Sequence, residues 1–79
     1  MTKTTLKKFL ALKQIKKDTQ YIFEAVNTST NVKETIRIRS EFNRSGRFVD
    51  FIILVNNIPL STTNSTTEGV HKWLKRRYK

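Results

Sequence analysis

Residues 32–42 show the clearest alternation in the chain, because the apolar residues fall on even positions and every odd position is polar or charged. Successive side chains of a β-strand point to opposite faces of the sheet, so this pattern predicts a half-buried strand. The inward set is Val32, Ile36, Ile38 and Phe42, and the outward set is Lys33, Thr35, Arg37, Arg39 and Glu41.

A second strand is expected over 47–55, a run rich in aromatic and β-branched residues. Residues 43–46, Asn-Arg-Ser-Gly, are typical of a turn that joins it to the first strand. A register with Phe42 opposite Arg47 places apolar beside apolar and cation beside anion. The expected pairs are Ile38 with Phe51, Ile36 with Ile53, and Arg39 with Asp50.

Further elements flank this hairpin. Helical spacing of Leu6, Phe9, Leu10 and Leu12 predicts a helix over 4–17, and residues 19–26 read as a strand. Residues 55–58, Val-Asn-Asn-Ile, predict a two-residue hairpin, because asparagine tolerates the positive φ of a type I′ turn.

The last strand should carry Ile58, Leu60 and Thr62 on the apolar face, and Pro59 should confine it to an edge. Residues 65–68, Ser-Thr-Thr-Glu, match a capping box that opens a C-terminal helix.

These elements predict an α+β fold, an antiparallel β-meander of three to four strands flanked by an N-terminal and a C-terminal helix, in the order α-β-β-β-β-α. We expect residues 1–79 to form a single small basic domain, since neither a linker nor a repeat divides the chain. Both helices should cover the apolar face and seal a core of Ile36, Ile38, Phe51, Ile53, Leu60, Trp73 and Leu74.

The charge balance indicates the kind of partner. Sixteen Lys and Arg residues against six Asp and Glu give a net charge of +10. A small domain needs a charge of magnitude only about 2–8 for solubility, and a larger excess repels itself. An anionic partner would offset this repulsion, so DNA or RNA is the expected partner. The alternative is a basic protein whose charge only maintains solubility.

Two clusters are candidates for contacting phosphates. The first comprises Lys33, Arg37 and Arg39 on the outer strand face with Arg44 and Arg47 at the turn. Arginine binds phosphate in a bidentate fork, and a two-stranded ribbon can enter a DNA major groove. The second comprises Lys72, Lys75, Arg76 and Arg77, with Tyr78 able to stack on a base or sugar.

The same reasoning leaves other functions open. Phe48, Ile52 and Leu54 fall on the outer strand face, where a helix covers them or a base or a protein contacts them. An exposed apolar patch of these residues would favour a protein partner. The alternative function is then that of a small viral or mobile-element-type protein that binds and inhibits or modulates a host nucleic-acid-processing protein. Membrane attachment through the first segment is not expected, because its apolar residues are needed for the core.

Enzymatic activity is not expected. His71 stands alone among lysines, the acidic residues match no metal or acid–base spacing, and no cofactor or metal site is predicted. The absence of cysteine excludes disulfides and thiolate zinc sites. It fits a reducing compartment, so we expect the cytoplasm, including a host's cytoplasm or nucleoid, or the nucleus where there is one.

Two local resemblances bear on nucleic acids. Residues 47–60 resemble the strand and turn of restriction-enzyme nuclease domains with a PD-(D/E)xK core, in which Asp50 would match the first acid. The positions of the second motif, Asn64, Ser65 and Thr66, hold neither an acid nor a lysine, which argues against nuclease activity. The threonine-rich stretch 60–67 before a helix is similar to the arm-type DNA-binding domains of phage-type integrases, which have three strands followed by a helix.

Overall fold

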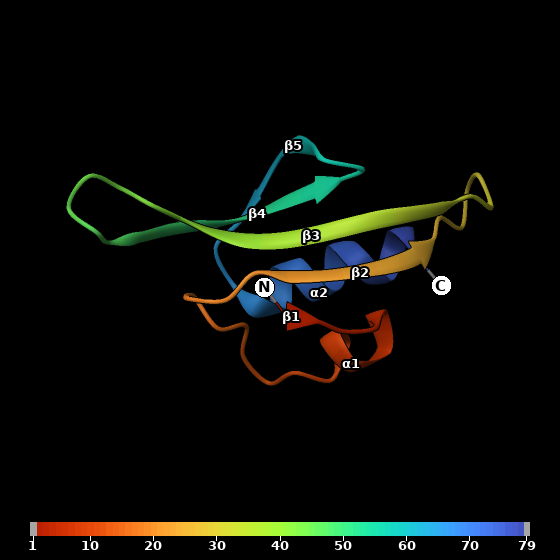
Figure 1. Ribbon diagram of the computed structural model, residues 1–79, viewed down its shortest axis with the longest axis horizontal. Helices are drawn as coiled ribbons and strands as arrows, with labels where there is room; N and C mark the ends of the chain where they lie inside the picture. Colours follow the sequence, from red (N-terminus) through yellow and green to blue (C-terminus); the bar gives the residue numbers. More distant parts are fainter. Residues whose placement is uncertain (1, 79) are drawn as a thin grey trace.

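The computed structural model, which describes residues 2–78, is a five-stranded sheet with both helices packed on one face (Figure 1). The strands β2 to β5 form an antiparallel meander, and β1 pairs with β2 in parallel at one edge. This confirms the predicted α+β class and order, to which β1 is an unpredicted addition. The elements are β1 (Thr2–Lys3), α1 (Leu6–Leu10), β2 (Tyr21–Val26), β3 (Lys33–Phe42), β4 (Phe48–Val55), β5 (Ile58–Asn64) and α2 (Thr67–Arg77).

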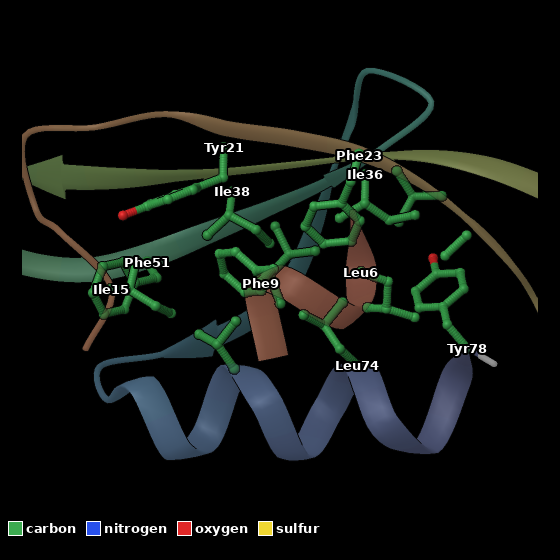
Figure 2. Close-up of a cluster of buried hydrophobic side chains, with 14 residues drawn as sticks. Leu6, Phe9, Ile15, Tyr21, Phe23, Ile36, Ile38, Phe51, Leu74 and Tyr78 are labelled. Carbon is green, nitrogen blue, oxygen red and sulfur yellow. The ribbon is translucent and has the colours of Figure 1, made fainter. Parts of the chain in front are cut away.

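The core lies between the sheet and the helices (Figure 2). Alternation in β3 directs Ile36 and Ile38 inward, and both are fully buried. Leu60 and Trp73, which were expected in the core, are only partly buried against it. The buried cluster is Leu6, Phe9, Ile15, Tyr21, Phe23, Ala25, Ile36, Ile38, Phe51, Ile53, Val55, Val70, Leu74 and Tyr78.

The predicted helix over 4–17 is wrong in length, since α1 ends at Leu10. Its start is capped by Thr5, whose hydroxyl accepts the Lys8 N–H at 3.2 Å. Ile15 explains the early end, because on a continuous helix it would lie about 120° around the axis from Phe9. Ile15 is instead buried from an irregular segment, where its N–H donates to the Thr67 hydroxyl at 3.0 Å.

The predicted register of the β3–β4 hairpin is also wrong, by two residues. The Asn43 side-chain oxygen accepts the N–H groups of Ser45 and Arg47 at 2.9 and 3.0 Å, which closes the loop one residue later than expected. A shift of two residues keeps the side chains of residues 50–55 on their expected faces, so the core is preserved. The observed pairs are Ile36 with Val55, Ile38 with Ile53, Arg39 with Ile52, and Glu41 with Asp50.

A bulge next to this loop moves Phe48 away from the outer face on which it was expected. Glu41 pairs with Asp50 and Phe42 with Phe48, so the intervening Val49 has no partner in the ladder. The Phe48 ring then lies 4.7 Å from that of Phe51, a core residue on the helix side.

The β4–β5 hairpin is confirmed, with φ of 51° and 67° at Asn56 and Asn57. Strand β5 is an edge strand, as Pro59 required. Ile58 is 65% exposed rather than in the core, because it lies at the end of the sheet. The predicted inward direction of Thr62 lies outside the side chains that the structure describes.

The C-terminal helix begins one residue later than its predicted capping box. Thr66, rather than Ser65, is the N-cap, and its hydroxyl accepts the Gly69 N–H at 3.0 Å. The helix α2 then continues to Arg77 and buries Val70 and Leu74 against the sheet.

Replacing Glu41 with glutamine should stabilise the domain. Glu41 and Asp50 are direct cross-strand neighbours on the outer face, and like charges in that position repel. We expect Glu41→Gln to raise the free energy of unfolding by about 0.2–1 kcal/mol in urea titrations at pH 7. The matched control is Glu24→Gln, whose partner is the uncharged Thr35. An equal gain in the control would show that the repulsion is not local to this pair.

Candidate nucleic-acid interface

The face of the sheet opposite the helices carries the first predicted cluster. Lys33 and Arg39 are exposed there, on the β3 positions that alternate with buried Ile36 and Ile38. Arg37 differs from these two residues, because it is half-buried and pairs across the strands with Leu54. Leu54 is only 8% exposed although no helix lies on this face. The stem of Arg37 therefore helps to shield an apolar residue.

The far end of the β3–β4 hairpin extends past both helices (Figure 1). Arg44 and Arg47 are exposed in its loop. Phe42 and Val49 flank this loop and are 48% and 41% exposed. Phe42 was expected on the inward face of its strand, and it lies on that face opposite Phe48, but the hairpin extends beyond the helices that would cover it. The tip thus combines two arginines with exposed apolar side chains, which the sequence pattern did not reveal.

Carboxylates lie among the cations of the outer face. Glu24, Glu41 and Asp50 are on this face, and the Glu41–Asp50 pair stands next to Phe42 and Val49, whereas Arg44 and Arg47 lie beyond it in the loop. We define the ribbon surface as Lys33, Arg37, Arg39, Arg44 and Arg47.

The second cluster forms on the solvent side of α2. Lys72, Lys75 and Arg76 are exposed and lie on the side of the helix away from buried Val70 and Leu74. We call these three cations the helix surface.

The imidazole of His71 does not add to the charge of the helix surface near neutral pH. Its ring lies against that of Phe9, with centroids 5.5 Å apart. Burial lowers the pKa of His71 below its ordinary value of 6.5, and the nearby Lys75 lowers it further.

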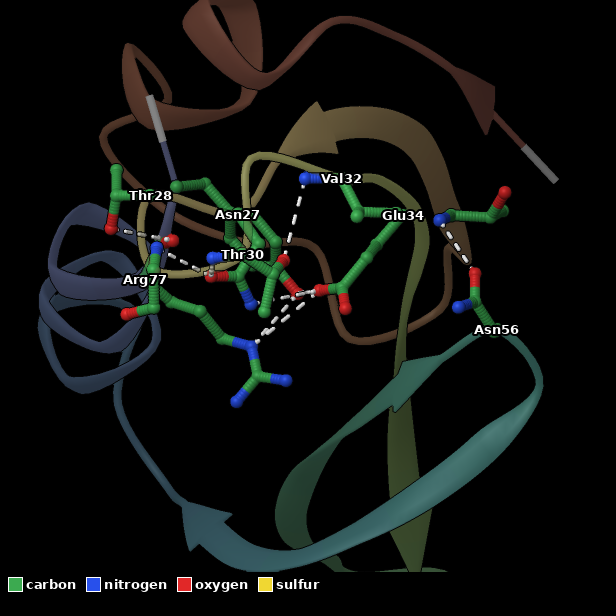
Figure 3. Close-up of polar contacts among 10 residues, drawn as sticks. Asn27, Thr28, Thr30, Val32, Glu34, Asn56 and Arg77 are labelled. Atoms are coloured by element: carbon green, nitrogen blue, oxygen red, sulfur yellow. Dashed lines mark hydrogen bonds and ion pairs between the residues drawn. The ribbon is translucent and has the colours of Figure 1, made fainter.

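Arg77 and Tyr78 do not belong to the exposed site that was predicted for them. The Arg77 side chain turns toward Glu34 (Figure 3). Tyr78 is 4% exposed, and its hydroxyl donates to a Glu34 carboxylate oxygen at 2.8 Å. Arg77 Nε donates to the same hydroxyl at 3.1 Å and lies 3.7 Å from Glu34. Burial raises the pKa of Tyr78 to about 12, and the hydrogen bond to Glu34 contributes. The stacking role proposed for Tyr78 is therefore excluded in this conformation.

Most of the basic charge is not used in internal ion pairs. Within residues 2–78, the structure contains one ion pair, between Arg77 and Glu34. The cations of the ribbon surface and the helix surface consequently have no carboxylate within 4.0 Å in this part of the chain. Their charge is available to an external anion.

The apolar patch that would favour a protein partner does not form from the residues expected to build it. Phe48 packs on the helix side, Leu54 is buried and Ile52 is half-buried. In the same described range there is no group of three His, Cys, Asp or Glu residues that could hold a metal ion. None of the helices in residues 2–78 is long and apolar enough to cross a membrane.

The chain matches no protein-family model, no curated protein and no solved structure. Its function therefore has to be argued from its own geometry and charge.

Proposed function

We propose that this protein is a nucleic-acid-binding accessory protein that contacts phosphates through the ribbon surface and the helix surface. The observation that carries the proposal is the availability of the charge. Eight predicted site cations, namely Lys33, Arg37, Arg39, Arg44, Arg47, Lys72, Lys75 and Arg76, have no carboxylate partner among the described residues. A net charge of +10 that is left free in this way favours a dense polyanion over a solubility role.

The shape of the ribbon supports nucleic acid over other polyanions. A two-stranded ribbon fits a DNA major groove, and exposed apolar side chains beside cations are used by proteins that wedge into base steps. The tip offers both features, since Phe42 and Val49 flank Arg44 and Arg47. Phosphate contacts should supply most of the affinity.

The salt dependence of binding tests this proposal. Binding to a 16-bp DNA duplex should weaken steeply as salt rises, because each phosphate contact releases counterions and contributes about 0.9 to the slope of log K against log[salt]. We expect the ribbon variant, Arg39→Gln/Arg44→Gln/Arg47→Gln, to lower the slope of binding at the ribbon surface by up to about 2.7. The helix variant, Lys72→Gln/Lys75→Gln/Arg76→Gln, should have a comparable effect on binding at the helix surface. Fluorescence anisotropy at several salt concentrations measures both.

The matched control is Lys8→Gln/Lys13→Gln/Lys16→Gln, which removes the same charge from exposed lysines outside both surfaces. It should leave the slope nearly unchanged. If all three variants lower the salt slope equally, the positive charge of the whole domain attracts DNA without a defined site, which would contradict the assigned surfaces. Binding to duplex DNA, single-stranded DNA and RNA that shows no salt slope at all would contradict the function itself.

A further inference from the structure

The two basic surfaces point in opposite directions. The outer-face cations of β3, Lys33 and Arg39, lie on one side of the sheet, and both helices cover the other side. On α2, the cations Lys72, Lys75 and Arg76 face away from the sheet, because the opposite stripe of the helix is buried on it. The sheet, the core and α2 therefore separate the two surfaces.

A single short duplex cannot reach both surfaces. A 16-bp duplex is a stiff rod about 54 Å long, at 3.4 Å for each base step. Bending 20–30 bp by only 40–90° already costs about 1–6 kcal/mol. The Cα trace of the domain measures 41 × 24 × 21 Å, so a rod lying along the ribbon would have to turn back on itself to meet α2. Each surface must therefore bind its own segment of nucleic acid.

We propose that the protein bridges two nucleic-acid duplexes, one held by the ribbon surface and the other by the helix surface. This inference rests on the proposed function and adds its mode of action. Lys75 and Arg76 lie in the last turn of α2, where the helix dipole favours cations. Together with Lys72 they nevertheless form three cations without a carboxylate partner, which repel the rest of a chain of net charge +10. A second polyanion on that side offsets the repulsion.

A capture experiment tests the bridge. One 16-bp duplex is fixed to beads, and a second duplex of the same length, which carries a fluorophore, is added with the full-length protein at about 50 mM salt. The wild-type protein should retain the labelled duplex on the beads. Retention should pass through a maximum and then fall as excess protein occupies both duplexes separately, and it should disappear at about 200 mM salt.

The ribbon variant and the helix variant defined above discriminate between explanations. Each should still bind one duplex in anisotropy measurements, and each should reduce retention of the second duplex to that of protein-free beads. The Lys8→Gln/Lys13→Gln/Lys16→Gln control should retain it. Circular dichroism checks that all variants are folded, as expected for surface substitutions.

Three results would overturn the bridge. Wild-type protein that binds one duplex with a salt slope but never retains a second would refute bridging and leave the proposed function intact. Retention that survives in either variant would show that a second copy of the chain supplies the second surface. In a parallel experiment, anionic lipid vesicles replace the labelled duplex. If the beads retain the vesicles but not a second duplex, one surface binds a membrane instead of DNA. A complete lack of nucleic-acid binding would refute the proposed function instead.

Discussion

Phe9→Ala should leave most of the protein unfolded at room temperature. Phe9 is fully buried, and its ring centroid lies 5.1 Å from that of Tyr21 and 5.2 Å from that of Phe23. Across the core it also meets His71, so this one ring joins α1, the sheet and α2. Truncating a buried phenylalanine removes about 3–5 kcal/mol, and a single core of this size supplies about 3–5 kcal/mol in total. Urea titration followed by circular dichroism measures the loss.

Phe42→Ala is the matched control for Phe9. The same side chain is removed, but Phe42 is 48% exposed at the ribbon tip. We expect this variant to lose less than about 1 kcal/mol of stability, because about half of the surface of Phe42 stays in water on folding. Similar stability losses in the two variants would contradict the placement of α1 on the core.

Tyr78→Phe is expected to have the second largest effect. The variant removes the hydroxyl that donates to Glu34 and accepts from Arg77. A hydrogen bond to a charged group contributes about 1.5–3 kcal/mol, so the free energy of unfolding should fall by that amount at pH 7. The same residues hold the end of α2 on the β2–β3 loop, because the Thr28 N–H donates to the Arg77 carbonyl at 2.9 Å. Hydrogen exchange should therefore increase in the last turn of α2.

The pH dependence gives this prediction a second, independent measure. The pKa of Tyr78 is raised from 10.0 to about 12 in the folded protein, so the folded state holds its proton more tightly than the unfolded state does. The stability that this proton contributes is fully present below pH 10 and is lost as pH rises to about 12. The difference between wild type and Tyr78→Phe should therefore shrink across this interval. A constant difference would contradict the buried hydrogen bond to Glu34.

Tyr21→Phe is the appropriate control. Tyr21 is also buried, at 5% exposed, but its hydroxyl accepts from the neutral N–H of Lys16 at 3.1 Å. A bond between neutral groups contributes about 0.5–1.5 kcal/mol. If Tyr21→Phe lowers the free energy of unfolding more than Tyr78→Phe does, the charge of Glu34 is not what strengthens the hydrogen bond from Tyr78.

The divergence of the two basic surfaces follows from two predictions made from the sequence. Alternation in β3 assigned Lys33 and Arg39 to the outer face, and both helices were expected on the opposite, apolar face; the structure confirms both. Only the structure shows that Lys72, Lys75 and Arg76 lie together on the outward side of α2. Because both helices pack on the same face, the two clusters diverge instead of merging into one patch. This divergence is what distinguishes a bridging protein from a protein with one binding face.

Local patterns were sufficient for the elements that local physics controls. The β2–β5 meander follows from period-2 alternation and from asparagines that accept positive φ, and the existence of α2 follows from its spacing of Val70 and Leu74. Contacts between distant segments decided the rest. The need to bury Ile15 ended α1 early, a bulge at Val49 shifted the β3–β4 register, and a hydrogen bond to Glu34 drew Tyr78 inside. Each of these depends on a partner that spacing along the chain does not identify, because burial and hydrogen bonding are properties of the assembled core.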